Sequence, residues 1–457
     1  MDAHSFLITN ARIVERGNDL RDAEILVLDG KIAEVGKPGE LHELRRQLGH
    51  DVATVDAHNS LVLPGLIDPH VHLRDSGVLN AEERQKEDFG TGSKAAVAGG
   101  VTTVFDMPNT IPPTTSVAAC RTKRDHAAKS SYCDFGLYAG ATSDNAATVH
   151  EVVTAGAVGV KMYVGSSTGS LLVSEPTAQE AHFKAAAEHD YLLAIHAEHE
   201  GCLERHAAMY EGKTGPHHHE VRPSECAEMA VQHALELGAK HKTRTYLCHV
   251  STGVEAALVR MAKQSGQSVF MEVAPHHLFL DDSEQDRQHN RVRMNPPLRS
   301  RADVRALWTA LNDGTADTIG TDHAPHTLEQ KRKPYWEAPS GVPGLETVLP
   351  LMVSAALQEK TTLERVQQLC CHNPARIFSL QGKGRLEPGF DADLVFVDLA
   401  SEKPVVESKL FTRCGWSPYA GMRLRGWPVK AFLRGQLVFD NGRHFGPYGN
   451  EIRKQLA

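Results

Sequence analysis

The sequence lacks the features that most directly assign a chain to a class of proteins. Its 8 cysteines are scattered and include no C-x-x-C pair. That spacing argues against a zinc ribbon and gives no disulfide framework, so we expect reduced, mostly packed thiols. No segment reaches the roughly 18 apolar residues of a membrane span, and the N-terminus has no basic stretch followed by an apolar one. We therefore expect a cytoplasmic protein that does not contact a membrane.

Long runs of charge of one sign are also missing. The net charge is -8, but the 49 basic and 57 acidic residues are well mixed along the chain. This pattern argues against a nucleic-acid partner. Hydrophobic residues make up 41% and charged residues 23% of the chain, as in ordinary globular proteins. Histidine, by contrast, is abundant: there are 26, several of them at predicted strand ends.

The two ends of the chain resemble each other more than either resembles the middle. Both carry short alternating strands separated by Asp-Gly or Asn-Gly turns, whereas the middle is rich in alanine and in helical periodicity. Because the termini of a domain often lie close together, we predict one small composite β domain, a β-sandwich, from residues 1–64 and 381–457. Residues 65–380 would form a second domain inserted between these two segments.

The middle region alternates predicted strands with predicted helices, in the manner of an α/β protein. One helix is expected to end at Gly99 and Gly100, and another to begin with a capping box of Thr177 and Glu180. Eight such units predict a (β/α)8 barrel; a doubly wound sheet is the alternative, but no Gly-x-Gly-x-x-Gly fingerprint follows a strand. The strands are expected at 63–72, 101–107, 134–140, 158–164, 191–198, 244–250, 268–273 and 317–323.

Potential metal ligands gather at the ends of these predicted strands. The stretch "GLIDPHVHLR", residues 65–74, has polar side chains at every second position, which places them on one face of a strand. In a barrel the strand ends converge on one mouth, and imidazole and carboxylate are ligands that suit zinc. The candidate ligands are His70, His72, Lys161, His196, His249 and Asp322, and Asp68 and Arg74 share the face of the first strand with the two histidines.

Structural roles are the alternative for each of these residues. A single histidine at a strand end is more often a hydrogen-bonded structural group than a ligand. A metal site nevertheless explains such residues at five or six strand ends better than independent coincidence does. Lys161 needs a separate explanation, because an ammonium group repels a metal ion. It binds an anionic group of the substrate, or carbon dioxide has converted it to a bridging carbamate, or it is a structural lysine that reaches the surface.

Longer motifs make this region similar to a known family. We find four stretches that resemble the motifs of the dihydroorotases, in the amidohydrolase superfamily: "GLIDPHVHLRD", "KEDFGTGSKAAVAGGVTTVFDMPNT", "MNPPLRSRADVRALW" and "GTDHAPHT". The resemblance extends into the C-terminal β region through "GRLEPGFDADLVFVD". The sequence departs from the family at Ser76, where proline is usual, and in the Gly/Ser-rich loop at 163–170.

The resemblance implies a site with two zinc ions per chain. His70, His72 and Asp322 would bind one ion, and His196 and His249 would bind the other. Lys161, carboxylated on its side-chain nitrogen, would bridge the two ions. The resemblance also implies a set of substrate contacts, namely Arg74, Asn109, Asn295, His326 and the backbone around Gly341.

The chemistry of two of these contacts fits an acidic substrate. The guanidinium group of Arg74 can bind a planar carboxylate with two hydrogen bonds, and the amide of Asn109 offers a donor and an acceptor. The alternatives are a surface ion pair for Arg74 and a turn residue for Asn109. For Asn295 and His326, the alternative is a structural role that stabilises the loops in which they lie.

The activity that the resemblance implies is the reversible hydrolysis of (S)-dihydroorotate to N-carbamoyl-L-aspartate, in pyrimidine biosynthesis. Asp322 would accept a proton from the attacking water and deliver it to the leaving nitrogen. The alternatives are another cyclic amidohydrolase (a hydantoinase, dihydropyrimidinase or allantoinase) and a non-catalytic homologue of dihydroorotase. A homodimer is expected, and association with aspartate transcarbamoylase is an open question.

Overall fold

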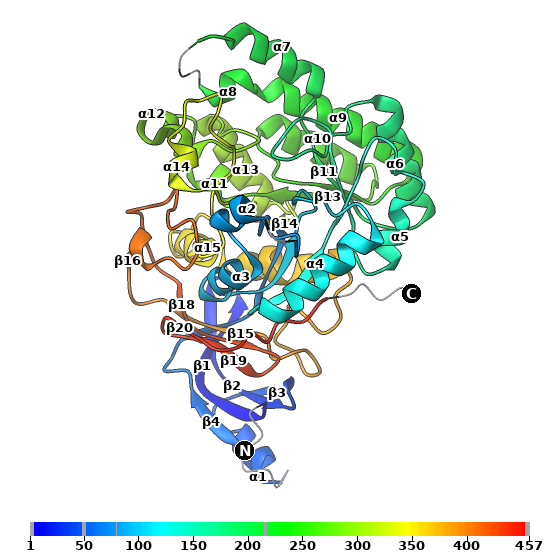
Figure 1. The fold of residues 1–457 in the computed structure, drawn as a ribbon. Helices are drawn as coiled ribbons and strands as arrows, with labels where there is room; N and C mark the ends of the chain where they lie inside the picture. Colours follow the sequence, from blue (N-terminus) through cyan, green and yellow to red (C-terminus); the bar gives the residue numbers. More distant parts are fainter. Residues whose placement is uncertain (1–3, 48–51, 79, 214, 216, 453–457) are drawn as a thin grey trace.

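The computed structural model describes residues 4–47, 52–78, 80–213, 215 and 217–452. A broad part of the molecule carries most of the helices, and a narrower part consists mainly of strands (Figure 1). In the narrower part the blue strands from the start of the chain lie beside the red strands from its end. The two chain ends therefore build one region together.

Pairing between β5 and β15 joins the two ends in a 9-stranded sheet. Leu63 of β5 lies opposite Val395 of β15, and both side chains are buried. Whether the domain limits fall at 64/65 and 380/381, and whether the sheet forms a sandwich, stay predictions. The strands of this sheet are β1 (Phe6–Arg16), β2 (Asp19–Leu28), β3 (Lys31–Gly36), β4 (Ala53–Asp56), β5 (Leu61–Pro64), β15 (Leu394–Asp398), β18 (Trp427–Leu433), β19 (Gln436–Asp440) and β20 (Arg443–His444).

All eight strands predicted for the middle region are present, and their pairings are parallel. The predicted strand at 134–140 is divided into β8 and β9 at Tyr138. One sheet runs β6-β7-β8 and the other β9 to β14 in chain order. The strands are β6 (Leu66–Val71), β7 (Val101–Asp106), β8 (Asp134–Leu137), β9 (Ala139–Gly140), β10 (Val160–Tyr163), β11 (Leu193–His196), β12 (Thr245–Leu247), β13 (Val269–Val273) and β14 (Thr318–Ile319).

A parallel bridge joins Val71, the last residue of β6, to His323, which follows β14 in the chain. The backbone N–H of His72 donates to the carbonyl of His323 at 2.8 Å. β8 and β9 belong to one continuous stretch of chain, which connects the two parallel sheets. This arrangement brings the carboxyl ends of β6 and β14 together.

Helices connect the parallel strands. As predicted, α3 ends at Gly99, followed by Gly100 with a φ of +81°. The predicted capping box is wrong: α6 begins at Pro176, whose fixed φ suits the first helical position. The helices are α1 (Leu41–Gln47), α2 (Ala81–Lys86), α3 (Phe89–Ala98), α4 (Val117–Ser130), α5 (Val149–Thr154), α6 (Pro176–Glu188), α7 (Glu200–Tyr210), α8 (His218–Val221), α9 (Ser224–His241), α10 (Gly253–Gln264), α11 (Pro275–Phe279), α12 (Glu284–Gln288), α13 (Arg301–Asn312), α14 (Leu328–Lys331), α15 (Val348–Leu357), α16 (Leu363–Gln367) and α17 (Asn373–Ile377).

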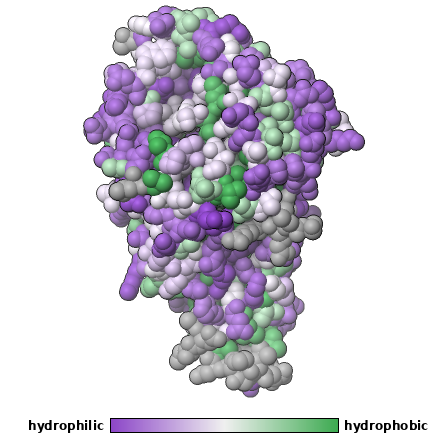
Figure 2. All heavy atoms as spheres, turned by 45° about the vertical axis from the view of Figure 1, so that its right-hand side comes forward, coloured by the Kyte–Doolittle hydropathy of each residue, from purple (hydrophilic) through white to green (hydrophobic). Residues whose placement is uncertain are grey.

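Shorter elements complete the chain. They are the helical turns η1 (His289–Val292), η2 (Gln368–His372) and η3 (Glu407–Lys409), and the strand pair β16 (Lys403–Pro404) and β17 (Arg423–Leu424). Hydrophilic residues cover most of the face shown in Figure 2, and its hydrophobic residues form small separate patches. Among the described residues, no helix combines the length and the apolar character needed to span a membrane.

The cysteines do not all match the prediction of reduced thiols. Cys202 and Cys226 form a disulfide that joins the first turns of α7 and α9. The two cysteines are 24 residues apart in sequence, so no short motif indicates that they are paired. Six cysteines are free thiols in the part of the chain that the structure describes: Cys120, Cys133, Cys248, Cys370, Cys371 and Cys414.

Candidate active site

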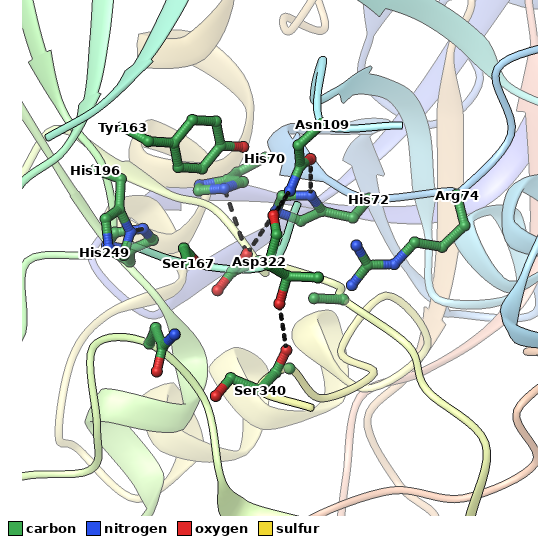
Figure 3. A pocket seen from close by; sticks show the side chains of 14 residues that line it. His70, His72, Arg74, Asn109, Tyr163, Ser167, His196, His249, Asp322 and Ser340 are labelled. Atoms are coloured by element: carbon green, nitrogen blue, oxygen red, sulfur yellow. Dashed lines mark hydrogen bonds and ion pairs between the residues drawn. The ribbon is translucent and has the colours of Figure 1, made fainter. Parts of the chain in front are cut away.

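The carboxyl ends of the parallel strands surround one pocket (Figure 3). In parallel α/β folds this edge is where catalytic groups gather. The lining includes every predicted site residue except Lys161 and His326, which lie against it. The lining residues are His70, His72, Arg74, Asn109, Tyr163, Ser167, Thr168, His196, His249, Asn295, Asp322, Ala324, Ser340 and Gly341.

Three buried side chains in this pocket form a group able to hold a metal ion. One ligand atom each of His70, His72 and Asp322 lies within 4.8 Å of the others. Nε2 of His72 is 3.0 Å and Nε2 of His70 is 3.3 Å from Oδ1 of Asp322. Burial opposes ionisation of Asp322, but the neighbouring imidazoles outweigh it and hold the pKa of this carboxyl well below its usual value. Asp322 is therefore an anion, as a ligand must be.

A second pair of imidazoles faces this group. Nδ1 of His196 lies 3.0 Å from Nε2 of His249. Burial lowers the pKa of His249 well below its usual value, and it lowers the pKa of His196 as well. Neutral imidazole is the form that binds metal ions, so the pair is suited to a second cation.

Lys161 lies in the middle of β10 and is fully buried. Its Nζ is 2.9 Å from Sγ of Cys248 and 5.1 Å from the ring centre of Tyr163. Among the described residues, no carboxylate lies within ion-pair distance of this ammonium group. A buried charge without a partner of opposite sign is costly. The alternative of a structural lysine that reaches the surface therefore does not fit its position.

Glu272 is a functional residue that the sequence interpretation missed. It is fully buried in β13, and its carboxylate accepts from Nδ1 of His70 at 2.7 Å, from the backbone of His249 at 2.8 Å and from the hydroxyl of Tyr246 at 2.8 Å. Burial disfavours the charged form of His70, but Glu272 outweighs it and raises the pKa to about 10. Glu272 thus orients two potential ligands. The only signal in the sequence was an acidic residue inside the apolar strand "SVFMEV".

Asn109 orients the other histidine of the first group. Nδ1 of His72 donates to Oδ1 of Asn109 at 2.8 Å, and Nδ2 of Asn109 donates to the carbonyl of Thr168 at 2.7 Å. Burial lowers the pKa of His72 to about 3. Since His70 and His72 both use Nδ1 in these bonds, Nε2 is the nitrogen that each turns toward Asp322. Hydrogen bonds of this kind orient the imidazoles of metal-binding histidines.

Arg74 and His326 meet at the mouth of the pocket. Nη2 of Arg74 is 3.2 Å from Nε2 of His326, which is also 3.0 Å from the carbonyl of Ser340. Burial, followed by the charge of Arg74, lowers the pKa of His326 well below its usual value. Nε of the buried Arg74 has no hydrogen-bond partner in the described part of the chain. The guanidinium group is therefore ready to bind an anion that enters the pocket.

Backbone strain concentrates at the strand ends. Arg74, His249 and Asp322 have φ values of 60°, 35° and 48°. Such conformations are unfavourable for residues other than glycine and persist where the surrounding structure holds them, often at functional sites. Gly341 has a φ of +137°, and a Cβ there would lie 2.4 Å from the carbonyl oxygen of Ala324. Only glycine fits at this edge of the pocket.

His218 is a second residue that the sequence interpretation missed. It begins α8, is buried, and contacts Oδ1 of Asn295 at 2.8 Å and the hydroxyl of Tyr335 at 2.7 Å. Burial lowers the pKa of His218 well below its usual value, so the imidazole is neutral. Asn295 lines the pocket, and His218 fixes its orientation from behind.

Comparison with known proteins identifies the family. Residues 61–438 match the model of the amidohydrolase family. The chain belongs to the amidohydrolase family. A dihydroorotase of Methanosarcina acetivorans is 38% identical over 442 residues, covering 94% of this chain and 91% of that protein. A dihydroorotase of Brevibacillus brevis is 35% identical, covering 95% and 99%.

Hydantoinases are also similar. An L-hydantoinase of Paenarthrobacter aurescens is 32% identical over 446 residues, covering 95% of this chain and 94% of that protein. The solved structure of L-hydantoinase (dihydropyrimidinase) from Arthrobacter aurescens has a TM-score of 0.91 at 29% identity and covers 98% of this chain and all of that one. The potential metal ligands at the pocket are consistent with the amidohydrolase family. They do not distinguish dihydroorotases from hydantoinases, so the substrate specificity has to be inferred from the other residues that line the pocket.

Proposed function

We propose that this amidohydrolase is a dihydroorotase, which hydrolyses the cyclic amide of dihydroorotate to N-carbamoyl-L-aspartate and closes the ring in the reverse direction. Dihydroorotases are among its relatives, at 38% and 35% identity over nearly the whole chain. The observation that carries the proposal is the buried Arg74, whose Nε lacks a partner in the described residues and which lines the pocket beside the histidines. A carboxylate on the substrate would complete its hydrogen bonds.

The proposal includes two zinc ions per chain. His70, His72 and Asp322 would hold one ion, and His196 and His249 the other. Carboxylation of Lys161 would replace its buried positive charge with a negative one and provide the bridge. Two such ions would make water nucleophilic at neutral pH and would polarise the amide carbonyl. The nitrogen and oxygen donors of this set suit zinc.

The side chains themselves position the substrate and move its protons. Arg74 would bind the carboxylate with two hydrogen bonds and so fix the ring over the histidines. Asp322, held ionised by His70 and His72, would accept the proton of the attacking water and deliver it to the leaving ring nitrogen. His326, kept neutral by burial and by Arg74, would remain a hydrogen-bonding group instead of a second cation.

The fold belongs to the same proposal. We infer that β6 to β14 close into a (β/α)8 barrel and that residues 1–64 and 381–457 form the accompanying β domain. Support comes from the bridge between Val71 and His323 and from the TM-score of 0.91 to a relative's structure. Another relative, the multifunctional protein CAD of Squalus acanthias, matches 88% of this chain with 16% of its own length. A homodimer and association with aspartate transcarbamoylase stay predictions.

A substrate panel tests this function. The purified chain would be assayed with dihydroorotate, hydantoin, dihydrouracil and allantoin, and its metal content measured on the same preparation. The proposal predicts turnover of dihydroorotate well above that of the uncharged rings. Hydantoinase is the second candidate, favoured by the L-hydantoinase relative and its structure. Preferential hydrolysis of hydantoin would support it, and bound metal without turnover would indicate a non-catalytic homologue.

A further inference from the structure

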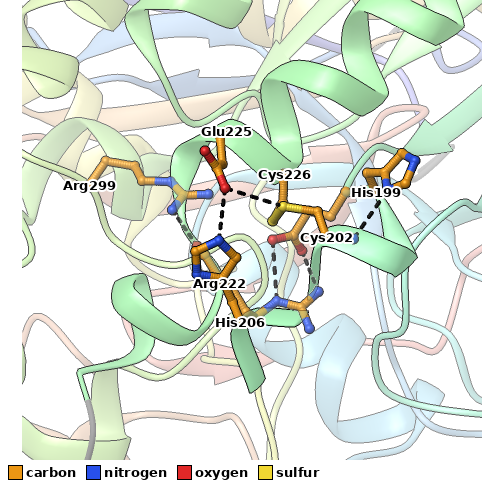
Figure 4. The surroundings of a disulfide bond; sticks show 8 residues. His199, Cys202, His206, Arg222, Glu225, Cys226 and Arg299 are labelled. Atoms are coloured by element: carbon orange, nitrogen blue, oxygen red, sulfur yellow. Dashed lines mark hydrogen bonds and ion pairs between the residues drawn. A yellow bond between two sulfur atoms is a disulfide. The ribbon is translucent and has the colours of Figure 1, made fainter. Parts of the chain in front are cut away.

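A second group of potential metal ligands lies outside the pocket, around the disulfide between α7 and α9 (Figure 4). Cys202 and His206 are four residues apart on α7 and so lie on the same face of the helix. Glu225 and Cys226 are adjacent in the first turn of α9. These four residues, which we call the thiol cluster, take no part in the proposed reaction.

The donor atoms of the thiol cluster converge. Nε2 of His206 lies 2.8 Å from Oε1 of Glu225, and Sγ of Cys202 lies 3.8 Å from the same oxygen. One ligand atom each of Cys202, His206 and Glu225 fits within 4.8 Å of the others. Cys226, with its Cα 5.4 Å from that of Cys202, adds a second sulfur at the same point. Figure 4 shows the carboxylate of Glu225 directed at both the imidazole and the sulfurs.

We propose that the thiol cluster is a zinc site in its reduced state, with Cys202, His206, Glu225 and Cys226 as the four ligands. Two thiolates, an imidazole and a carboxylate match the ligands and the coordination number that zinc prefers in structural sites. Thiolates disfavour magnesium and calcium, which prefer oxygen ligands. Two ligands at positions i and i+4 of one helix are also a recurrent zinc-binding arrangement.

Metal binding and the disulfide exclude each other, because the same two sulfurs are needed for both. A phosphine and one water molecule convert the disulfide to two thiols, and the phosphine becomes a phosphine oxide. The two thiols then lose their protons as they bind the ion. In the reverse direction a peroxide accepts two electrons from the two thiolates, the sulfurs join, the ion leaves and the peroxide yields two hydroxide ions.

Contacts other than the disulfide keep the ligands close together after reduction. The N–H of His199 donates to the carbonyl of Cys226 at 2.8 Å, and Nδ1 of His199 accepts from the N–H of Cys202 at 3.2 Å. Both cysteines are fully buried, whereas the side chains of His206 and Glu225 are 21% and 59% exposed. A metal ion can therefore reach the cluster from solvent through its imidazole and carboxylate side.

Cobalt(II) binding to the full-length protein tests the proposal. Thiolate ligands give cobalt an intense near-ultraviolet charge-transfer band, which the nitrogen and oxygen ligands proposed for the pocket do not. The oxidised protein is expected to show no such band. Reduction with a phosphine, which adds no thiol of its own, should produce it at one additional metal equivalent per chain, and added zinc should remove it.

Variants assign the band to its ligands. Cys202→Ser and Cys226→Ser should abolish it, whereas Cys414→Ser, at a half-buried free thiol elsewhere, should leave it unchanged. His206→Ala retains the disulfide when oxidised, which provides a check on folding. After reduction it should weaken cobalt binding at least about tenfold, since even outer-shell partners of a metal contribute that much.

Two results would overturn the proposal. One is a reduced protein that shows no charge-transfer band and binds no additional metal, which would leave the cluster a structural disulfide. The other is a band that survives in the Cys202→Ser/Cys226→Ser protein, which would assign it to the buried Cys248 beside Lys161.

Discussion

The pocket at the strand ends and the thiol cluster between α7 and α9 are two groups of potential metal ligands built in opposite ways. The side chains of His70 and Asp322 come from opposite ends of the parallel-strand region, and only 1% and 9% of them are exposed. Those of His206 and Glu225 are close in sequence and partly open to solvent. On the two proposals, ligands brought together by the strands would make a permanent site, and ligands that can form a disulfide would make a conditional one.

The physical difference lies in what holds the ligands in place. In the pocket, β-strand ends fix the backbone, and Glu272 and Asn109 fix the imidazoles of His70 and His72. This preorganisation is independent of redox state. In the thiol cluster the two sulfurs are ligands only when they are not bonded to each other. Each of the following predictions changes one group and leaves the other as an internal reference.

The largest effect is expected from Asp322→Asn. The amide cannot accept the proton of water, and it is a poorer metal ligand than a carboxylate. We expect the turnover of dihydroorotate to fall by about 10²- to 10⁴-fold, the usual size of a general acid-base contribution. Asp313→Asn, at a carboxylate outside the pocket, should keep the wild-type rate. A near-normal rate for Asp322→Asn with unchanged metal content would contradict the proton-transfer role.

Arg74→Lys separates recognition of the substrate from hydrolysis. Lysine keeps the charge but loses the bidentate geometry, and a hydrogen bond to a charged group contributes about 1.5–3 kcal/mol. We expect kcat/KM for dihydroorotate to fall by about 10- to 100-fold, by the usual conversion of about 1.4 kcal/mol per tenfold. Activity on hydantoin, which has no carboxylate, is the reference. An equal loss on both substrates would mean that Arg74 acts on the metal site instead of on the carboxylate.

Glu272→Gln tests the preorganisation of the pocket. Glutamine keeps an acceptor oxygen but not the negative charge that faces His70. We expect the affinity for zinc to fall by about tenfold, the lower end of the range for outer-shell partners. Tyr246→Phe removes a different bond to Glu272 and should have less effect. Unchanged zinc affinity in Glu272→Gln would show that the strand ends alone position the imidazoles.

The smallest effect is expected from His206→Ala in the oxidised protein. Its imidazole is at the surface of the thiol cluster, so the free energy of unfolding should change by no more than about 0.5 kcal/mol. Replacing Cys202 and Cys226 by serine opens a loop of 24 residues and should destabilise the protein by about 3 kcal/mol. Denaturant titration of both variants measures the difference. A large effect of His206→Ala without metal would make the imidazole a structural residue.

Periodicity predicted the strands of the middle region, because parallel strands bury both faces and read as short apolar runs. The positions of the candidate ligands followed from the same pattern. His70, His196 and His249 stand out as polar residues at the ends of apolar runs, and the structure brings them to one pocket. The start of α6 was wrong because Pro176 is itself a strong signal for the first helical position.

Contacts between residues far apart in sequence could not be predicted. The role of Glu272 depends on the register that places β13 beside β12 and on the rotamer that reaches His70. The disulfide depends on how α9 packs against α7, which the spacing of Cys202 and Cys226 does not encode. The role of His218 depends on its contact with Asn295, which is 77 residues away in sequence.

Titration of the metal-free, oxidised protein with zinc, with dihydroorotate turnover recorded at each addition, tests the central claim most directly. The account predicts no turnover without metal, full turnover at two equivalents per chain, and a mass increase that matches carboxylation of Lys161 under native conditions. Full turnover after exhaustive chelation, or two bound ions with Lys161 unmodified at full activity, would contradict it.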